Sequence, residues 1–137
     1  NVAIFETDGE TVIHRVPPGV IQDEIVPDWA EGCTTLVPNS HIKEITTHMV
    51  EEKVKTMTIK SLIEKHSISS IDFIQIDTEG YDYEIFLQLR EAEFYPKLFK
   101  IEIAHVTYTK SVWVRWFLEQ EGYKTFIDGY DLIAYRF

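Results

Sequence analysis

The sequence predicts an α/β domain of three layers, and three observations carry that prediction. From Val54 onward, segments with strand and helix patterns alternate in the order strand, helix, strand, helix, strand, helix, strand, strand. One of these strands, Ile71 to Ile76, is too densely apolar to have a wet face, which is typical of the middle of a helix-covered parallel sheet. The last two strands are close enough in sequence to form a hairpin, so one edge of the sheet is predicted to be antiparallel.

The residues before Val54 are less regular. Val2 to Glu6 and Thr11 to Val16 predict the two strands of a β-hairpin, because the Asp8-Gly9 pair between them tolerates the positive φ of a tight turn. From Pro17 to about Glu51, four prolines and an irregular apolar spacing interrupt every pattern. We expect this long excursion to be a partly ordered lid or binding loop.

The first helices of the alternating part have clear local signals. Val54 to Met57 alternates as a half-buried strand does, and Thr58 is placed to cap a helix that ends near His66-Ser67. Tyr81 to Arg90 predicts a second helix, with acidic residues in its first turn where the helix dipole favours them.

The C-terminal third predicts one more strand, a helix and a hairpin. Leu98 to Ala104 is the strand, and Ser111 is expected to cap a helix that Gly122 ends. The tail then predicts two hairpin strands, Tyr123 to Ile127 and Leu132 to Phe137.

Composition excludes several classes of function. The net charge of −10 and the pI of about 4.9 disfavour nucleic acid or an anionic membrane as partner, because phosphate binding needs Lys and Arg. The single cysteine, Cys33, cannot form an intramolecular disulfide, and no apolar run approaches the roughly 20 residues that span a bilayer. We therefore expect a cytoplasmic chain and place residues 1–137 in one domain. The absence of a Gly-rich phosphate loop and of a GxSxG elbow excludes P-loop and α/β-hydrolase chemistry.

Polar side chains follow two of the predicted strands at the point where each strand ends. Asp77, Thr78 and Glu79 follow the strand 71–76, and His105 follows the next strand. Ligands of open α/β sheets bind beyond the carboxyl ends of the strands. If these two strands are neighbours, a carboxylate and an imidazole face one crevice, where they are suited to taking a proton from a hydroxyl or amine.

Other interpretations of these residues stay open. Asp77 and Glu79 could simply cap the helix that follows, His105 could be structural, and Gly80 is expected to relieve crowding in the turn. A metal site is a weaker hypothesis. Asp77, Glu79, Glu102 and His105 are suitable ligand types, but Glu102 lies inside a strand and need not point where His105 does. No HExxH pattern is present, and no metal ion is expected.

The stretch Ile71 to Tyr81, IDFIQIDTEGY, closely resembles the signature segment of FkbM-type methyltransferases, in which a buried strand ends in Asp-x-Glu-Gly and a helix follows. Gln75 departs from this pattern, since many members carry Lys there. The similarity extends to four further segments: the hairpin around Asp8-Gly9, Val54 to Leu62, Lys100 to Ile103, and Gly122-Tyr123.

This resemblance implies a Rossmann-like methyltransferase sheet, mostly parallel with an antiparallel C-terminal hairpin. It implies methyl transfer from S-adenosylmethionine, usually to oxygen, with a small molecule or sugar as the expected acceptor. The expected site residues are catalytic Asp77, Glu79 and His105, and cofactor-binding Asp77, Thr78 and Gly80; His105 is included because of its place after the next strand and not because of the family pattern. Acceptor specificity is expected in the excursion, which contains Trp29, Cys33 and His41.

Two cofactor-binding features of the family are missing from the sequence, a glycine-rich turn after the first strand and an acid after the second. The chain is therefore expected to be the C-terminal part of the domain, N-terminally truncated and inactive by itself. A sheet without its first strands has a bare edge, which predicts self-association into a homo-oligomer. The alternative hypothesis is a non-catalytic, truncated or degenerate methyltransferase-fold module that serves assembly or ligand binding.

Overall fold

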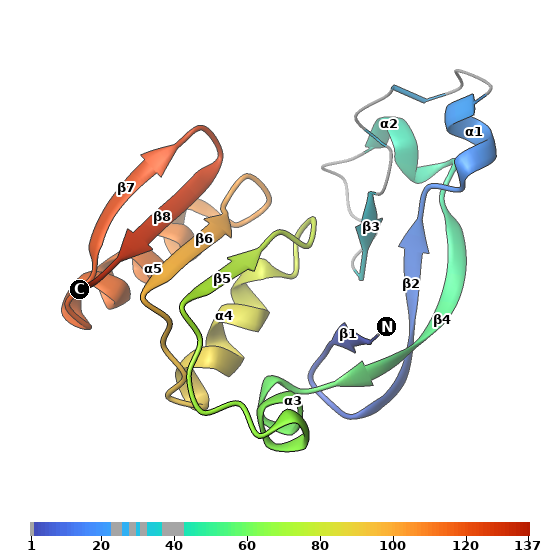
Figure 1. Cartoon of the computed structure of the whole chain (residues 1–137). Coiled ribbons are helices and arrows are strands. Elements are labelled where there is room, and N and C mark those ends of the chain that lie inside the picture. Colours follow the sequence, from blue (N-terminus) through green and yellow to red (C-terminus); the bar gives the residue numbers. More distant parts are fainter. Residues whose placement is uncertain (1, 23–25, 28–29, 31–32, 37–42) are drawn as a thin grey trace.

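A computed structural model describes residues 2–22, 26–27, 30, 33–36 and 43–137, and it contains two four-stranded sheets (Figure 1). Sheet A has the strand order β1-β4-β2-β3 and contains β1 (Ala3–Ile4), β2 (Gly9–Arg15), β3 (Thr34–Thr35) and β4 (Val50–Met57). Sheet B has the order β5-β6-β8-β7 and contains β5 (Phe73–Ile76), β6 (Leu98–Glu102), β7 (Lys124–Asp128) and β8 (Asp131–Tyr135). The helices are α1 (Pro18–Gln22), α2 (Lys43–Thr46), α3 (Ile59–His66), α4 (Asp82–Glu91) and α5 (Tyr108–Gln120).

In sheet A the predicted N-terminal hairpin is wrong, because β4 lies between β1 and β2. β1 pairs in parallel with the end of β4, and β2 pairs with β4 in the antiparallel sense along its whole length. The physical reason lies in the turn. Asp8 accepts hydrogen bonds from the Thr58 backbone N–H (2.8 Å) and the Ser61 hydroxyl (2.6 Å), so the turn is held at the start of α3. Thr56 adds a bond from its hydroxyl to the Thr7 carbonyl oxygen (2.8 Å).

The excursion from Pro17 to Glu51 is ordered in the parts that the structure describes. It contributes α1, β3 and α2, and β3 pairs with β2. A small apolar cluster lies among these elements and contains Val16, Val26, Ala30, Cys33 and Ile45. Trp29 and His41, predicted to contribute to specificity, lie outside the described residues.

The predicted helix starts are partly confirmed. Thr58 caps α3 by accepting a hydrogen bond from the Ser61 N–H (3.0 Å), and the helix ends at Ser67, which is left-handed at φ 49°. α4 also follows the prediction. α5 begins earlier than predicted, after Thr107, and Ser111 lies inside its first turn with its hydroxyl bonded to the Tyr108 carbonyl oxygen (2.9 Å). The prediction that Ser111 is a cap is therefore wrong, because α5 already begins after Thr107, although the Thr107 side chain makes no capping hydrogen bond.

Sheet B is mixed, not mostly parallel. Only β5 and β6 pair in parallel, through the crossover helix α4, whereas β6 with β8 and β8 with β7 are antiparallel. The predicted C-terminal hairpin is thus confirmed. Helices α4 and α5 cover one face of the sheet (Figure 1), and within the described part of the chain no helix covers the other. The three-layer, mostly parallel sheet of the prediction is not seen, because β8 enters beside β6 and occupies the position of a further parallel strand.

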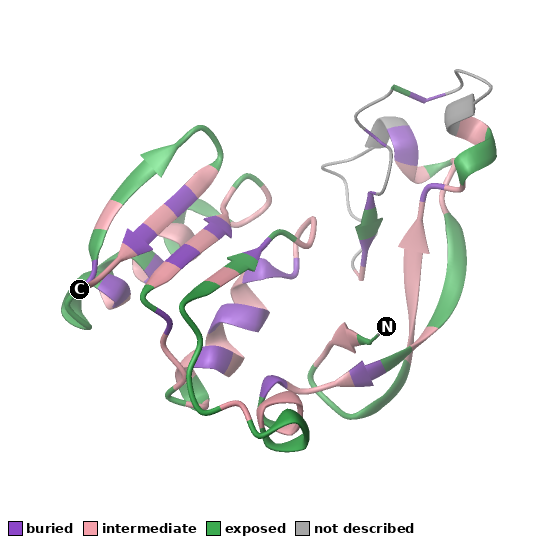
Figure 2. Cartoon of the chain, viewed as in Figure 1, coloured by how far each residue is buried: buried purple, intermediate pink, exposed green. Residues whose placement is uncertain are grey.

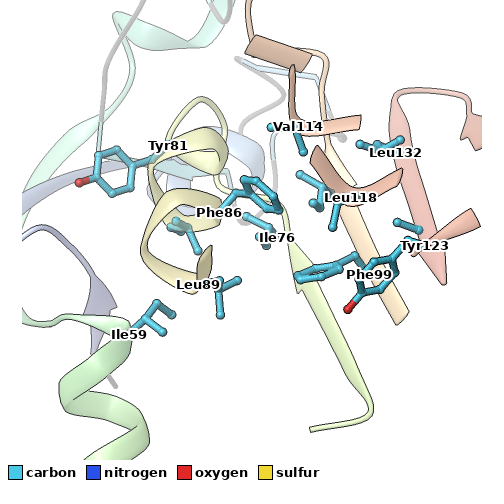
Figure 3. Packing of buried hydrophobic residues seen from close by; sticks show 13 residues of the cluster. Ile59, Ile76, Tyr81, Phe86, Leu89, Phe99, Val114, Leu118, Tyr123 and Leu132 are labelled. Atoms are coloured by element: carbon cyan, nitrogen blue, oxygen red, sulfur yellow. The ribbon is translucent and has the colours of Figure 1, made fainter. Parts of the chain in front are cut away.

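The main core lies between sheet B and its two helices (Figure 3). Phe86 of α4 meets Phe99 of β6 in an edge-to-face contact with ring centroids 6.1 Å apart. Trp113 and Phe117 of α5 pack against this core. The fully enclosed members of the cluster include Phe86, Phe99, Ile101, Leu118, Leu132 and Ala134.

The apolar strand β5 does not lie in the middle of a buried sheet. Ile76 is buried, but Phe73 is 45% exposed and Ile71 is also exposed (Figure 2). β5 is an edge strand of sheet B, since within the described residues it pairs only with β6. The prediction of a strand covered on both faces is therefore wrong for this chain.

Gln88 of α4 connects the two halves of the fold. Its side-chain N–H donates to the Phe5 carbonyl oxygen (3.0 Å), and its side-chain oxygen accepts from the Ile59 N–H (2.9 Å). Phe5 also stacks on Tyr81 with ring centroids 5.7 Å apart. The end of β1 and the start of α3 are thereby held against α4. None of the described helices has the length and apolar character needed to cross a membrane.

Candidate active site

A buried acid shapes the loop between β5 and α4. Asp82, the first residue of α4, is fully buried, and its two carboxylate oxygens accept hydrogen bonds from the backbone N–H groups of Thr78 (2.8 Å) and Gly80 (3.0 Å). A negative charge at a helix N-terminus is also stabilised by the helix dipole. The loop from Asp77 to Gly80 is therefore fixed by a residue that sequence reasoning placed only among the first-turn acids. An Asp two residues after a glycine at a helix start is the local signal that could have identified it.

Glu79 occupies a strained backbone position within this loop. Its φ of 54° lies in the left-handed region, which costs a non-glycine residue on the order of 1 kcal/mol. Its carbonyl oxygen accepts from the Thr35 hydroxyl (3.0 Å), and the Cys33 thiol lies 3.7 Å from Oε1 of its carboxylate. Both contacts join residues more than 40 positions apart, so no local sequence signal could have revealed them.

The predicted convergence of carboxylate and imidazole is confirmed. β5 and β6 are parallel neighbours, and Nε2 of His105 lies 3.0 Å from Oε2 of Glu79. Both side chains are about four-fifths buried, with 18% and 22% exposed. The pair therefore lies largely shielded from solvent at the carboxyl ends of the two strands.

Glu102 joins this pair, although its place inside a strand left open whether it points toward His105. Oε1 of Glu102 lies 3.9 Å from Nε2 of His105. The reason is a tight turn directly after β6, closed by a hydrogen bond from the Val106 N–H to the Ile103 carbonyl oxygen (3.2 Å), which folds His105 back toward the strand end. Side chains alternate between the two faces of a strand, so the direction of Glu102 is predictable. The direction of His105 is not, because His105 lies in the turn after the strand.

Burial and negative neighbours perturb two groups at the site. Burial, followed by the charges of Asp77 and Glu79, raises the pKa of Glu102 to about 7. Burial, followed by the charge of Glu79, raises the pKa of the Cys33 thiol to about 11. Oε2 of Glu102 is buried and has no hydrogen-bond partner among the described residues. The site is thus strongly electronegative.

Asp77 and Thr78 face a cavity of about 410 Å³. Asp77 is exposed, and across the cavity lie residues of sheet A and the adjoining segment, including Thr35, Leu36 and Val54. The buried hydroxyl of Thr78 has no partner among the described residues, so it is available to a ligand. A mostly apolar cavity of this size with polar groups on one side is typical of small-molecule sites.

A protein-family model matches most of the chain. The family model of the Methyltransferase FkbM domain matches residues 3–125, which include sheet A, strands β5 and β6 of sheet B, the β5–α4 loop and the three clustered side chains. The chain belongs to the FkbM methyltransferase family. This assignment confirms the resemblance that the segment Ile71 to Tyr81 indicates. No curated protein and no solved structure matches the chain significantly.

In this FkbM methyltransferase domain, the predicted site residues fall into two groups. Glu79 and His105 are in contact, whereas Asp77 and Thr78 line the neighbouring cavity. Gly80 has a φ of 113°, which favours glycine, and its N–H is engaged by Asp82. The Gly80 N–H is therefore poorly suited to bind a cofactor. The hydroxyl of Thr78, by contrast, is suited to bind a polar ligand group.

Proposed function

We propose that this FkbM domain transfers a methyl group from S-adenosylmethionine to a hydroxyl oxygen of a small molecule or sugar. The single observation that carries the proposal is the contact of 3.0 Å between His105 and Glu79, at the ends of neighbouring strands in a chain of a methyltransferase family. An imidazole paired with a carboxylate is suited to removing the proton that a hydroxyl loses when it accepts a methyl group.

The roles of the residues follow from the positions of their side chains. Asp77 lines the cavity and orients the acceptor hydroxyl by accepting its hydrogen bond. His105 takes the proton, and the Glu79 carboxylate stabilises the imidazolium that forms. Carboxylates favour the positive sulfonium of the reactant over the neutral product, so they cannot assist by stabilising the leaving sulfide. Their contribution is positioning of the acceptor and support of the base.

S-adenosylmethionine supplies an electrophilic methyl group when it is bound. We place part of its binding site outside these 137 residues, because the sequence has no glycine-rich turn. In this proposal, further parallel strands complete a Rossmann-like sheet along the open edge of β5, and Asp77 and Thr78 contact the cofactor from this side. The chain alone then binds the cofactor weakly and is inactive. Cytoplasmic location remains part of the same proposal.

The missing glycine-rich turn also favours a second candidate, a non-catalytic module that uses its cavity for binding or its edge for assembly. Methyl transfer by a protein that contains this chain distinguishes the two. With radiolabelled S-adenosylmethionine, wild-type protein is expected to label a hydroxyl acceptor. Absence of labelling across a panel of sugars and small alcohols would favour the non-catalytic module.

The Asp77→Asn variant tests the proposal that the acceptor binds in the cavity that Asp77 lines. Loss of the carboxylate that orients the acceptor is expected to lower kcat/KM at least about 100-fold. Asp72→Asn is the matched control, because Asp72 is an exposed acid at the other end of the same strand segment, paired with Lys97. Its activity is expected to equal that of the wild type. Full activity of Asp77→Asn contradicts the proposed role.

A further inference from the structure

Three side chains at the end of sheet B converge on one point. Glu79, Glu102 and His105 each offer one ligand atom, and these atoms all lie within 4.8 Å of one another. They come from the β5–α4 loop, from the last residue of β6 and from the turn after β6. We propose that this triad binds one divalent transition-metal ion, with Zn²⁺ and Mn²⁺ as the best-fitting candidates.

The chemistry of the triad fits such ions. Imidazole nitrogen and carboxylate oxygen are the ligands that Zn²⁺ and Mn²⁺ accept, whereas an all-oxygen set would favour Mg²⁺ or Ca²⁺. Ligand atoms in a tetrahedral site with bonds of about 2.0–2.2 Å lie about 3.4 Å apart. His105 Nε2 lies 3.0 Å from Glu79 and 3.9 Å from Glu102, so only small side-chain movements are needed. Three protein ligands leave a coordination position open, as in catalytic rather than structural sites.

A second, independent observation is the buried oxygen of Glu102. Oε2 is enclosed and has no partner among the described residues, which is unfavourable for a carboxylate. Asp77, Asp82 and Asp131 add to the negative potential around it. Lys100, which precedes Glu102 by two positions, forms an ion pair with Asp131 (3.1 Å). A bound dication would satisfy the orphan oxygen and reduce the repulsion among the acids.

The position of Glu79 is held in place before any ion binds. Its left-handed backbone is anchored by the Thr35 hydroxyl, and the Cys33 thiol lies 3.7 Å from its carboxylate. Groups that orient a ligand in this way commonly raise metal affinity. Capping of a helix does not by itself require a strained backbone at Glu79. In this proposal the strain positions the Glu79 carboxylate for the ion.

The cation site depends on the triad alone. Its effect on catalysis rests on the proposed function: in the metal-bound state Nε2 of His105 is a ligand and not the base, and the ion would instead lower the pKa of an acceptor hydroxyl at the open coordination position. Metal binding is measured without cofactor or acceptor, so failure of methyl transfer and failure of metal binding are separate results.

Calorimetric titration of the chelator-treated chain with Zn²⁺ or with Mn²⁺ tests the site. One ion per chain is expected, and Glu102→Gln and His105→Gln are each expected to weaken binding at least about tenfold. Glu91→Gln and His66→Gln are matched controls, because they remove the same groups at exposed positions, and they are expected to bind like the wild type. Circular dichroism checks that each variant is folded, and if Glu102→Gln is unfolded, His105→Gln decides the test.

Two outcomes would overturn the site. One is the absence of stoichiometric binding of either ion to the wild-type chain. The other is binding that is unchanged in the folded triad variants, or weakened equally in the exposed controls, since either pattern places the ion elsewhere. Anomalous diffraction from a Mn²⁺ or Zn²⁺ complex is expected to place the ion between the three ligand atoms.

Discussion

Asp82 shows how much a single side chain determines at this site. Four acids lie within eight residues, at Asp77, Glu79, Asp82 and Glu84, and the sequence does not rank them. In the structure Asp77 is exposed at the cavity, whereas Asp82 is completely enclosed and holds the loop. The acid that faces a ligand and the acid that supports the loop are thus different residues with different physical tasks.

Replacing Asp82 is therefore expected to destabilise the chain. Asp82→Ala leaves the N–H groups of Thr78 and Gly80 without acceptors, and each such group costs about 1–3 kcal/mol, so a loss of about 2–6 kcal/mol of unfolding free energy is expected. Urea unfolding measures it. Asp72→Ala, at an exposed position, is expected to cause no measurable change. A negligible effect of Asp82→Ala would show that the two hydrogen bonds do not hold the loop.

At the scale of single elements, the sequence predicts the start of a helix correctly only where the predicted capping hydrogen bond forms. Thr58 is preceded by a strand and followed by a clear apolar face, and its hydroxyl makes the predicted bond. Ser111 has the residue type of a cap, but Thr107 precedes it by one turn and α5 begins there. The sequence alone does not decide between two residues of capping type one turn apart, because either is compatible with the apolar spacing that follows, and the Thr107 side chain makes no capping bond in the structure.

The two hydroxyls are expected to differ in their contribution to stability. Thr58→Ala removes an N-cap bond and is expected to cost about 1 kcal/mol. Ser111→Ala, inside a helix, is expected to change the unfolding free energy by less than about 0.5 kcal/mol, because alanine's higher helix propensity offsets the lost bond. Thermal and urea unfolding of both variants measure the difference. Equal losses would mean that Ser111 does act at the helix start.

At the scale of the whole molecule, the outer edge of β5 is an unpaired edge of sheet B as the structure describes it, with apolar side chains beside it. Among the described residues, nothing pairs with this edge, and Phe73 is 45% exposed beside it. A cavity of about 380 Å³ lies along β5 and is lined mostly by apolar side chains. Unpaired strand edges with apolar neighbours associate readily with other chains.

We therefore expect the isolated chain to self-associate through β5. Phe73→Lys places a charge at this edge and is expected to shift the chain toward monomer in sedimentation equilibrium. Phe126→Lys is the control, because Phe126 is comparably exposed at 48% but lies on β7, the opposite edge of sheet B. Loss of association in the β7 variant alone would assign the contact to the other edge, and a monomeric wild type would contradict the expectation.

By itself the sequence determined the helices α3 and α4, the C-terminal hairpin, the family, and the position of Asp77, Glu79 and His105 at strand ends. Those signals are local, since caps, turn residues and apolar spacing act over a few positions. The tertiary structure decided the pairing of β1 with β4, the exposure of β5 and the burial of Asp82. It also decided the approach of Cys33, Thr35 and Glu102 to the Glu79–His105 pair. These features depend on which distant segments pack together, and that is set by the burial and hydrogen bonding of the whole chain rather than by any stretch of it.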